Sequence, residues 1–238
     1  MDLEVKDKTI LCVGAHADDT DFGSSASVAK WVKMGATVYY LILTDGSKGS
    51  EDMSIPSKQL VKMRVKEQKE AAKVLGVKEV FFGGFKDGEL VNSAEVRKII
   101  VKLIRQQRPN IVLTIDPTFV YDERSGFINH PDHRAAGQAT LDSIFPFARN
   151  SRTFPEFLDQ GLPVHIVRDV LLTNFAKRNF YIDVTDTLEV KFRALEKHVS
   201  QLDDKEKLFN RVRERAEKIG QEAGFKYAEG FVHIHIGH

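Results

Sequence analysis

Short apolar segments alternate with longer amphipathic segments through the first half of this chain. The apolar segments predict strands at 9–13, 37–43, 79–82 and 111–115. The amphipathic segments between them predict helices at 23–34, 57–75 and 93–107. Parallel strands that neighbour each other need a crossover connection, which is usually a helix. The alternation therefore predicts an α/β fold: a Rossmann-like, mostly parallel sheet with helices on both faces.

The second half of the chain is less regular. Its patterns predict strands at 164–173 and 228–236 and helices at 131–147, 188–202 and 204–222. Segment 145–161 is rich in Pro, Arg and Phe, and we interpret it first as an irregular connection, with a lid or an oligomer contact as alternatives. Because no repeat or flexible linker interrupts the 238 residues, we expect a single domain over 1–238.

Composition narrows the class of partner. A formal net charge of +1 gives no bulk attraction to nucleic acid or to a membrane surface, so we expect neither as a partner. No apolar run approaches the roughly 18 residues that a spanning helix needs. Cys12 is the only cysteine and lies in an apolar run, which predicts a buried structural thiol. We therefore expect a cytoplasmic protein.

Polar residues with metal-binding chemistry follow the first predicted strand. The segment reads Gly14-Ala15-His16-Ala17-Asp18-Asp19-Thr20-Asp21-Phe22-Gly23, where a dinucleotide-binding loop would usually carry three glycines. Three carboxylates beside an imidazole would repel a phosphate, but they suit a divalent cation. In open parallel sheets, ligands bind beyond the carboxyl ends of the strands, which is where this segment lies.

A second candidate cluster follows the fourth predicted strand. It reads Asn129-His130-Pro131-Asp132-His133-Arg134, and Pro131 is typical of the first turn of a helix. His130 and His133 are three residues apart, so both can face the same side of that turn. We expect them to meet the first cluster above the sheet.

Two imidazoles and one carboxylate leave coordination positions for water and substrate, as in catalytic zinc sites. Each cluster alone is also compatible with surface polarity or helix capping, but their coincidence at two strand ends favours a metal site. A non-haem iron oxygenase has a similar ligand set and is the second enzymatic reading, and a metal-dependent sugar-binding protein is the non-enzymatic one. His233, His235 and His238 form a further group, interpreted as residues that share a strand face rather than as ligands.

The two clusters resemble the signature motifs of the LmbE-like, or PIG-L, N-acetylglucosaminyl deacetylases. Weaker matches extend along the chain, at Thr44-Asp45-Gly46, Arg64, Glu67, Lys191, Ala194, His198, Ser200, Gln201 and Ala228-Glu229-Gly230-Phe231. Ala17 stands where the family usually has Pro, and Thr20 stands where many members have Glu.

The resemblance implies zinc ligands at His16, Asp19 and His133, with other divalent metals able to substitute. It also implies a general base at Asp18, and a role for His130 in stabilising or protonating the reacting amide. Arg64 and Arg124 are the candidates for holding a polar group of the substrate. The implied reaction is hydrolysis of the N-acetyl group of a GlcNAc-containing small molecule by metal-activated water, with release of acetate. Relatives of this kind also suggest a homo-oligomer.

Overall fold

The computed structural model describes residues 3–123, 126–202 and 204–237. Its helices are α1 (Asp19–Lys33), α2 (Ser57–Leu75), α3 (Ala94–Gln107), α4 (Pro131–Ile144), α5 (Glu156–Asp159), α6 (Leu188–Leu195) and α7 (Lys205–Ala223). Its strands are β1 (Thr9–Gly14), β2 (Thr37–Thr44), β3 (Glu79–Phe85), β4 (Ile111–Ile115), β5 (Tyr121–Asp122), β6 (Phe127–Ile128), β7 (Asp169–Thr173), β8 (Phe180–Asp183) and β9 (Ala228–His235).

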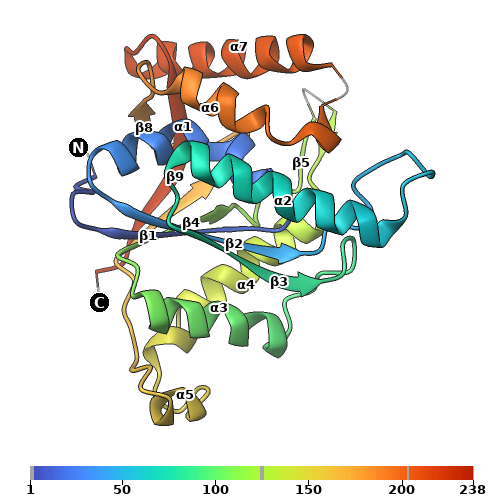
Figure 1. Cartoon of the computed structure of the whole chain (residues 1–238). Helices are drawn as coiled ribbons and strands as arrows, with labels where there is room; N and C mark the ends of the chain where they lie inside the picture. The colour runs from blue at the N-terminus through green and yellow to red at the C-terminus, as the bar shows by residue number, and fades with distance from the viewer. Residues whose placement is uncertain (1–2, 124–125, 203, 238) are drawn as a thin grey trace.

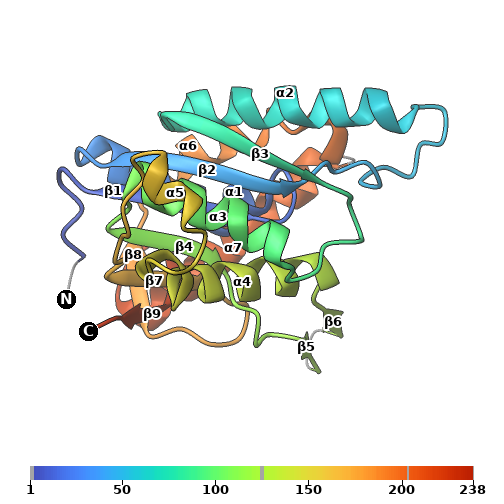
Figure 2. The same ribbon diagram turned by 90° about the horizontal axis from the view of Figure 1, so that it is seen from below.

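In the described ranges, the main sheet has seven strands in the order β3-β2-β1-β4-β7-β9-β8. The five strands from β3 to β7 are mutually parallel, and β9 pairs antiparallel with both β7 and β8. Helices α1, α2, α6 and α7 cover one face, and α3, α4 and α5 lie on the other (Figure 1). Figure 2 shows the same layers from below. The predicted α/β class with a mostly parallel sheet is confirmed.

The two faces of the sheet bury two separate apolar cores. Strand residues alternate between them: Leu11 and Val13 pack with the side of α3 and α4, while Ile10 and Cys12 pack with the side of α1. Cys12 is a buried free thiol, as its place in the apolar run predicts. Strands buried on both faces explain why the sequence shows unbroken apolar runs rather than an apolar–polar alternation.

Several predicted boundaries were wrong. Helix α1 begins at Asp19 rather than at residue 23, so Asp19 lies in its first turn. The predicted helix 188–202 ends at Leu195; the chain then turns, and a short 3-10 helix spans Val199–Gln201. The strand predicted over 164–173 begins at Asp169. The short strands β5, β6 and β8 were not predicted, because two to four residues carry too little periodicity.

Segment 145–161 is anchored by one buried arginine of α3. Arg105 is 1% exposed. It donates to five backbone carbonyls of this segment, those of Phe147, Ala148, Asn150, Thr153 and Phe154, at 2.8–3.4 Å. A fixed guanidinium thereby donates hydrogen bonds to carbonyl groups that lie outside the β-sheets. The segment is an ordered connection that packs beside α3.

We expect Arg105→Met to lower the free energy of unfolding by about 3 kcal/mol, because it removes five hydrogen bonds between a buried guanidinium and this segment. Chemical denaturation of this variant and of Lys102→Met, an exposed position on the same helix, measures the difference. Equal stability of the two variants would show that the arginine does not hold the segment.

No helix in these ranges combines the length and the hydropathy needed to cross a membrane.

Candidate active site

The candidate site lies where the strand order reverses direction. Strand β1 is followed by α1 and then by β2 on one side, whereas its other neighbour, β4, is reached from β3 through α3. Loops leaving two such strands separate and open a crevice at their carboxyl ends, which is the usual ligand site of open α/β sheets. The loop after β1 carries His16 and Asp18, and the start of α4 brings His130 and His133 to the same place. The convergence predicted from sequence is therefore observed.

Three donor side chains lie at the spacing of a tetrahedral metal site. The Nδ1 of His16 lies 3.2 Å from the Nε2 of His133. That Nε2 lies 3.0 Å from the Oδ1 of Asp19, whose Oδ2 lies 3.7 Å from the Nδ1 of His16. Zinc bonds of about 2.0–2.1 Å in a tetrahedron place donor atoms about 3.3 Å apart. The two distances to the Nε2 of His133, 3.2 Å from His16 and 3.0 Å from Asp19, lie near this spacing, so these three residues could hold a zinc-sized ion.

Asp19 is held in place by the backbone. Its Oδ2 accepts hydrogen bonds from the N–H groups of Ala15 and His16, each at 2.8 Å. Burial alone would raise the pKa of this carboxyl, but His133, and then His16, hold it well below its usual range. Asp19 therefore stays ionised, and its Oδ1 faces His133.

Carboxylates and an amide behind the imidazoles fix which ring nitrogen faces the site. The Nε2 of His16 lies 3.2 Å from both the Oδ1 of Asp87 and the Oδ2 of Asp132. The Nδ1 of His133 lies 3.0 Å from the Oδ1 of Asn129. Outer partners of this kind hold the N–H of a ligating histidine and leave its other nitrogen free for a metal.

Sequence reasoning assigned no role to Asp87, Asn129 or Asp132. Asp87 follows β3, so the strand-end rule applied to the third strand would have found it. Asn129 and Asp132 lie inside the second cluster, but no spacing rule separates a ligand from its supporting residue there.

Other groupings of possible ligands exist among the described residues. Ring nitrogens of His16, His130 and His133 lie within 4.8 Å of one another, and so do donor atoms of His16, Asp87 and Asp132. Asp132 already accepts from the backbone N–H groups of Gly88 and Leu90, at 2.7 and 3.1 Å. A carboxylate satisfied in this way suits the support of His16 better than it suits direct ligation.

Asp18 has an unusual backbone conformation, which distinguishes it from its neighbour Asp19. It is the N-cap of α1 with φ 96°, a left-handed region that only a few non-glycine residues adopt. Burial raises the pKa of its carboxyl to about 6, although the nearby Arg64 acts in the opposite direction. The side chain lines the cleft beside Asp19. Such a carboxyl is suited to exchanging a proton near neutral pH.

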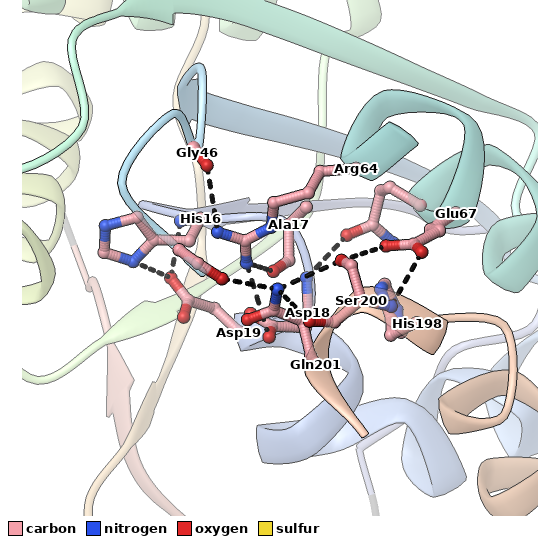
Figure 3. Close-up of polar contacts among 12 residues, drawn as sticks. His16, Ala17, Asp18, Asp19, Gly46, Arg64, Glu67, His198, Ser200 and Gln201 are labelled. Atoms are coloured by element: carbon pink, nitrogen blue, oxygen red, sulfur yellow. Dashed lines mark hydrogen bonds and ion pairs between the residues drawn. The ribbon is translucent and has the colours of Figure 1, made fainter. Parts of the chain in front are cut away.

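Arg64 links the loop that carries Asp18 to the loop after β2. Its Nη2 lies 2.7 Å from the carbonyl oxygen of Ala17 and 3.4 Å from the Oδ2 of Asp18, and its Nη1 lies 3.4 Å from the carbonyl oxygen of Gly46 (Figure 3). The side chain is 4% exposed and lines the cleft, so it is buried within the site rather than solvated. Its predicted contact with substrate stays a prediction. Arg124 lies outside the described residues.

A buried polar chain supports the backbone at Asp18. The Oε1 of Gln68 accepts from the Asp18 N–H at 2.9 Å, and its Nε2 donates to the Oδ2 of Asp21 at 2.8 Å. That Oδ2 also lies 2.7 Å from the Nε2 of His198, and both side chains are at most 1% exposed. A left-handed residue persists only when its surroundings over-determine it. Gln68 therefore positions Asp18.

We expect Gln68→Met to lower kcat about tenfold while the metal content stays unchanged, because the Asp18 backbone loses its acceptor. Gln59→Met, an exposed position on the same helix, is the matched control. Metal analysis and steady-state kinetics of both variants provide the test. A wild-type kcat in Gln68→Met would mean that the backbone conformation does not depend on this bond.

His130 lies at the N-cap of α4. Its Nδ1 accepts from the Asp132 N–H at 3.1 Å, and its ring centroid lies 4.7 Å from that of His16. Burial, and then the proximity of His16, lower the pKa of its imidazole. The ring lines the cleft together with His16 and His133.

Two pairs among the weaker sequence matches hold elements of the fold together. Glu67 accepts from the backbone N–H and the hydroxyl of Ser200, at 2.8 and 2.6 Å, and ties α2 to the 3-10 helix. The Nζ of Lys191 lies 2.6 Å from Glu229 and ties α6 to β9. These ion pairs and hydrogen bonds assemble the face that carries Asp18.

The C-terminal histidines belong to a different end of the sheet. His233 and His235 both contact the Oδ1 of Asp169, at 2.8 and 2.9 Å, where β7 begins and β9 ends. They share a strand face, as the sequence predicts, and they are not among the residues that line the candidate site. His238 lies outside the described residues.

A cleft of about 770 Å³ opens over these residues. It is large enough for a small molecule.

The comparisons with known proteins agree with this site. Residues 11–144 match the PIG-L family model, described as GlcNAc-PI de-N-acetylase. A diacetylchitobiose deacetylase of Thermococcus kodakarensis is 37% identical over 95% of this chain and 86% of its own length. A probable N-acetyl-alpha-D-glucosaminyl L-malate deacetylase 2 of Bacillus anthracis is 26% identical over 61% of this chain and 63% of its own length.

Solved structures show the same fold. The N,N'-diacetylchitobiose deacetylase of Pyrococcus horikoshii has a TM-score of 0.87 and 34% identity, covering 95% of this chain and 84% of that one. GalB, a 4-carboxy-2-hydroxymuconate hydratase of Pseudomonas putida, has a TM-score of 0.79 at 18% identity, covering 96% of this chain and 97% of its own, which shows the fold alone. Since one fold serves different reactions, the site and the sequence decide. The chain belongs to the PIG-L family and is an amide hydrolase of its deacetylase type.

Proposed function

We propose that this chain, as a single domain over 1–238, is a zinc-dependent deacetylase that removes the N-acetyl group from a GlcNAc-containing small molecule and releases acetate. The observation that carries the proposal is the donor triangle of His16, Asp19 and His133 with a second carboxylate, Asp18, beside it. The relatives named as deacetylases of N-acetylated sugars support the substrate class.

Each residue has a distinct task in the proposed reaction. Zinc held by His16, Asp19 and His133 would supply Lewis acidity and lower the pKa of a water to about 7. Asp18 accepts a proton from the water while the oxygen of that water attacks the amide carbon. When the carbon–nitrogen bond breaks, a proton returns to the leaving nitrogen, which gives a free amine and acetate. His130 stabilises the charge that develops on the amide oxygen or supplies the proton.

Family membership favours hydrolysis over iron-dependent oxygenation, and the second carboxylate at Asp18 favours turnover over ligand binding without chemistry. Acetate release from N-acetylglucosamine, diacetylchitobiose and an N-acetylglucosaminyl malate, measured with added zinc and without nucleotide or oxidant, tests the proposal. We expect acetate from at least one of them and about one zinc per chain. No acetate from any of them under metal-replete conditions would contradict it.

A cytoplasmic location and a homo-oligomeric assembly are part of the same proposal. Light scattering of the purified protein tests the assembly, and a strictly monomeric mass would remove that part.

A further inference from the structure

The cleft continues well beyond the candidate metal ligands. Its far part lies between the carboxyl ends of β4 and β7, the start of β9 and one side of α7. The residues lining this part are mainly apolar: Phe22, Ile115, Phe127, Phe175, Leu208, Val212, Ala216 and Ile219. The α7 members recur at helical spacing, so a single face of the helix borders the cleft. If the N-acetyl group of a substrate lay at the candidate metal ligands, the rest of the substrate could occupy this far part of the cleft.

Two cations that line the cleft form no ion pair with another described residue. The cleft is lined by Lys48, Arg64, Lys191, Arg211 and Arg215. Lys48 pairs with Glu89, Arg64 with Asp18, and Lys191 with Glu229. Arg211 and Arg215, both on α7, make no hydrogen bond or ion pair with any residue in the described ranges. The two unpaired charges thus lie at the apolar end of the cleft.

Arg215 is held over an aromatic cluster. Its guanidinium carbon lies 4.1 Å from the centre of the Phe175 ring. Phe175 in turn lies 5.1 Å from Phe127 and 5.5 Å from Phe119, measured between ring centroids. Stacking on a ring fixes the plane of a guanidinium and leaves its N–H edge free for a carboxylate or phosphate.

The surroundings of Arg215 favour an incoming anion. Arg211 and Arg215 are both exposed side chains that line the cleft, so an anion can reach them without displacing a protein partner. A neutral sugar would leave both charges without a partner.

We propose that this end of the cleft is an aglycone subsite, and that the preferred substrate is an N-acetylglucosaminide whose aglycone is an apolar body bearing a carboxylate or phosphate group. The proposal rests on the proposed function and adds the chemical class of the group that is attached to the sugar. Arg211 and Arg215 bind the anionic group, and the aromatic cluster with the apolar face of α7 contacts the body.

Three substrates of equal ring size and equal anomeric configuration test the subsite: phenyl, 4-carboxyphenyl and 4-phosphonophenyl N-acetylglucosaminide. Acetate release gives kcat/KM for each. For the wild type at low ionic strength we expect the anionic substrates to exceed the phenyl substrate about tenfold, mainly through KM, because these contacts act on binding rather than on the reacting bond. The ratio of the carboxyl to the phosphono substrate shows which anion fits better.

The double variant Arg211→Gln/Arg215→Gln should reduce the anionic-to-neutral ratio to about one, as should about 0.5 M salt with the wild type. Lys218→Gln removes one charge from an exposed position of the same helix and should keep the wild-type ratio. The salt series needs no variant, so the test holds even if the double variant is unstable.

The outcomes separate the two proposals. Acetate from all three substrates at equal kcat/KM overturns the subsite and leaves the deacetylase proposal standing. A preference for anionic substrates that survives the double variant also overturns it. No acetate from any substrate with zinc present overturns the deacetylase proposal and the subsite together.

Discussion

Asp18→Asn is expected to retain the metal and lose about a hundredfold or more in kcat, the scale of a positioned acid–base group. The adjacent carboxylates have different surroundings: Asp19 accepts two backbone hydrogen bonds and contacts His133, whereas Asp18 forms an ion pair with Arg64 at 3.4 Å. Burial holds the Asp18 pKa at about 6, so at pH 7 most of the carboxyl is ionised and able to accept a proton. An amide at this position keeps the shape and removes the base.

Metal content by atomic spectroscopy, followed by kinetics at saturating zinc, checks the Asp18→Asn prediction. The exposed Asp52→Asn provides a carboxylate-to-amide control far from the catalytic residues in sequence, and we expect it to keep both metal and rate. An Asp18→Asn protein that lacks metal and regains its rate with excess zinc would mean that Asp18 is the ligand.

Much of the fold was predictable from the first half of the sequence, where the strands are short apolar runs and α2 and α3 are amphipathic. The C-terminal half was harder, because β9 runs antiparallel between β7 and β8, and β8 spans only Phe180–Asp183. Helix 188–202 was predicted too long because its periodicity continues through residues that turn away so that His198 meets Asp21. That contact joins residues 177 positions apart, which no local pattern reports.

The candidate ligands were predictable because their spacing and their place after strands carry the signal. Their supports were not, since Asp87 and Gln68 act through contacts made only in the fold. Arg105 likewise reads as one more charge on an amphipathic helix until the five carbonyls around it are known. In each case a charged or polar residue is buried by a segment that lies far away in the sequence.

Asp19→Ala and His133→Ala are expected to lose most of the bound zinc, and activity should fall with occupancy. Loss of an outer partner typically costs 10- to 100-fold in metal affinity, and loss of one of three ligands should cost more than about 100-fold. His133→Ala removes a donor nitrogen that lies 3.0 Å from Asp19 and 3.2 Å from His16, so only two of the three proposed ligands remain. His235→Ala is the matched control, because it removes an exposed imidazole at the other end of the sheet.

Zinc titration separates the loss of a ligand from the loss of a base. In Asp19→Ala the rate should recover in part with excess zinc, whereas Asp18→Asn should stay slow at full occupancy. Asp19→Asn is a useful companion variant, since its amide oxygen can still accept from the backbone N–H groups of Ala15 and His16 and so preserves the loop. If Asp19→Asn binds zinc weakly while its thermal stability without metal matches the wild type, the defect lies in ligation rather than folding. Full zinc occupancy in His133→Ala would remove His133 from the ligand set and leave His16 and His130 as the imidazoles to test next.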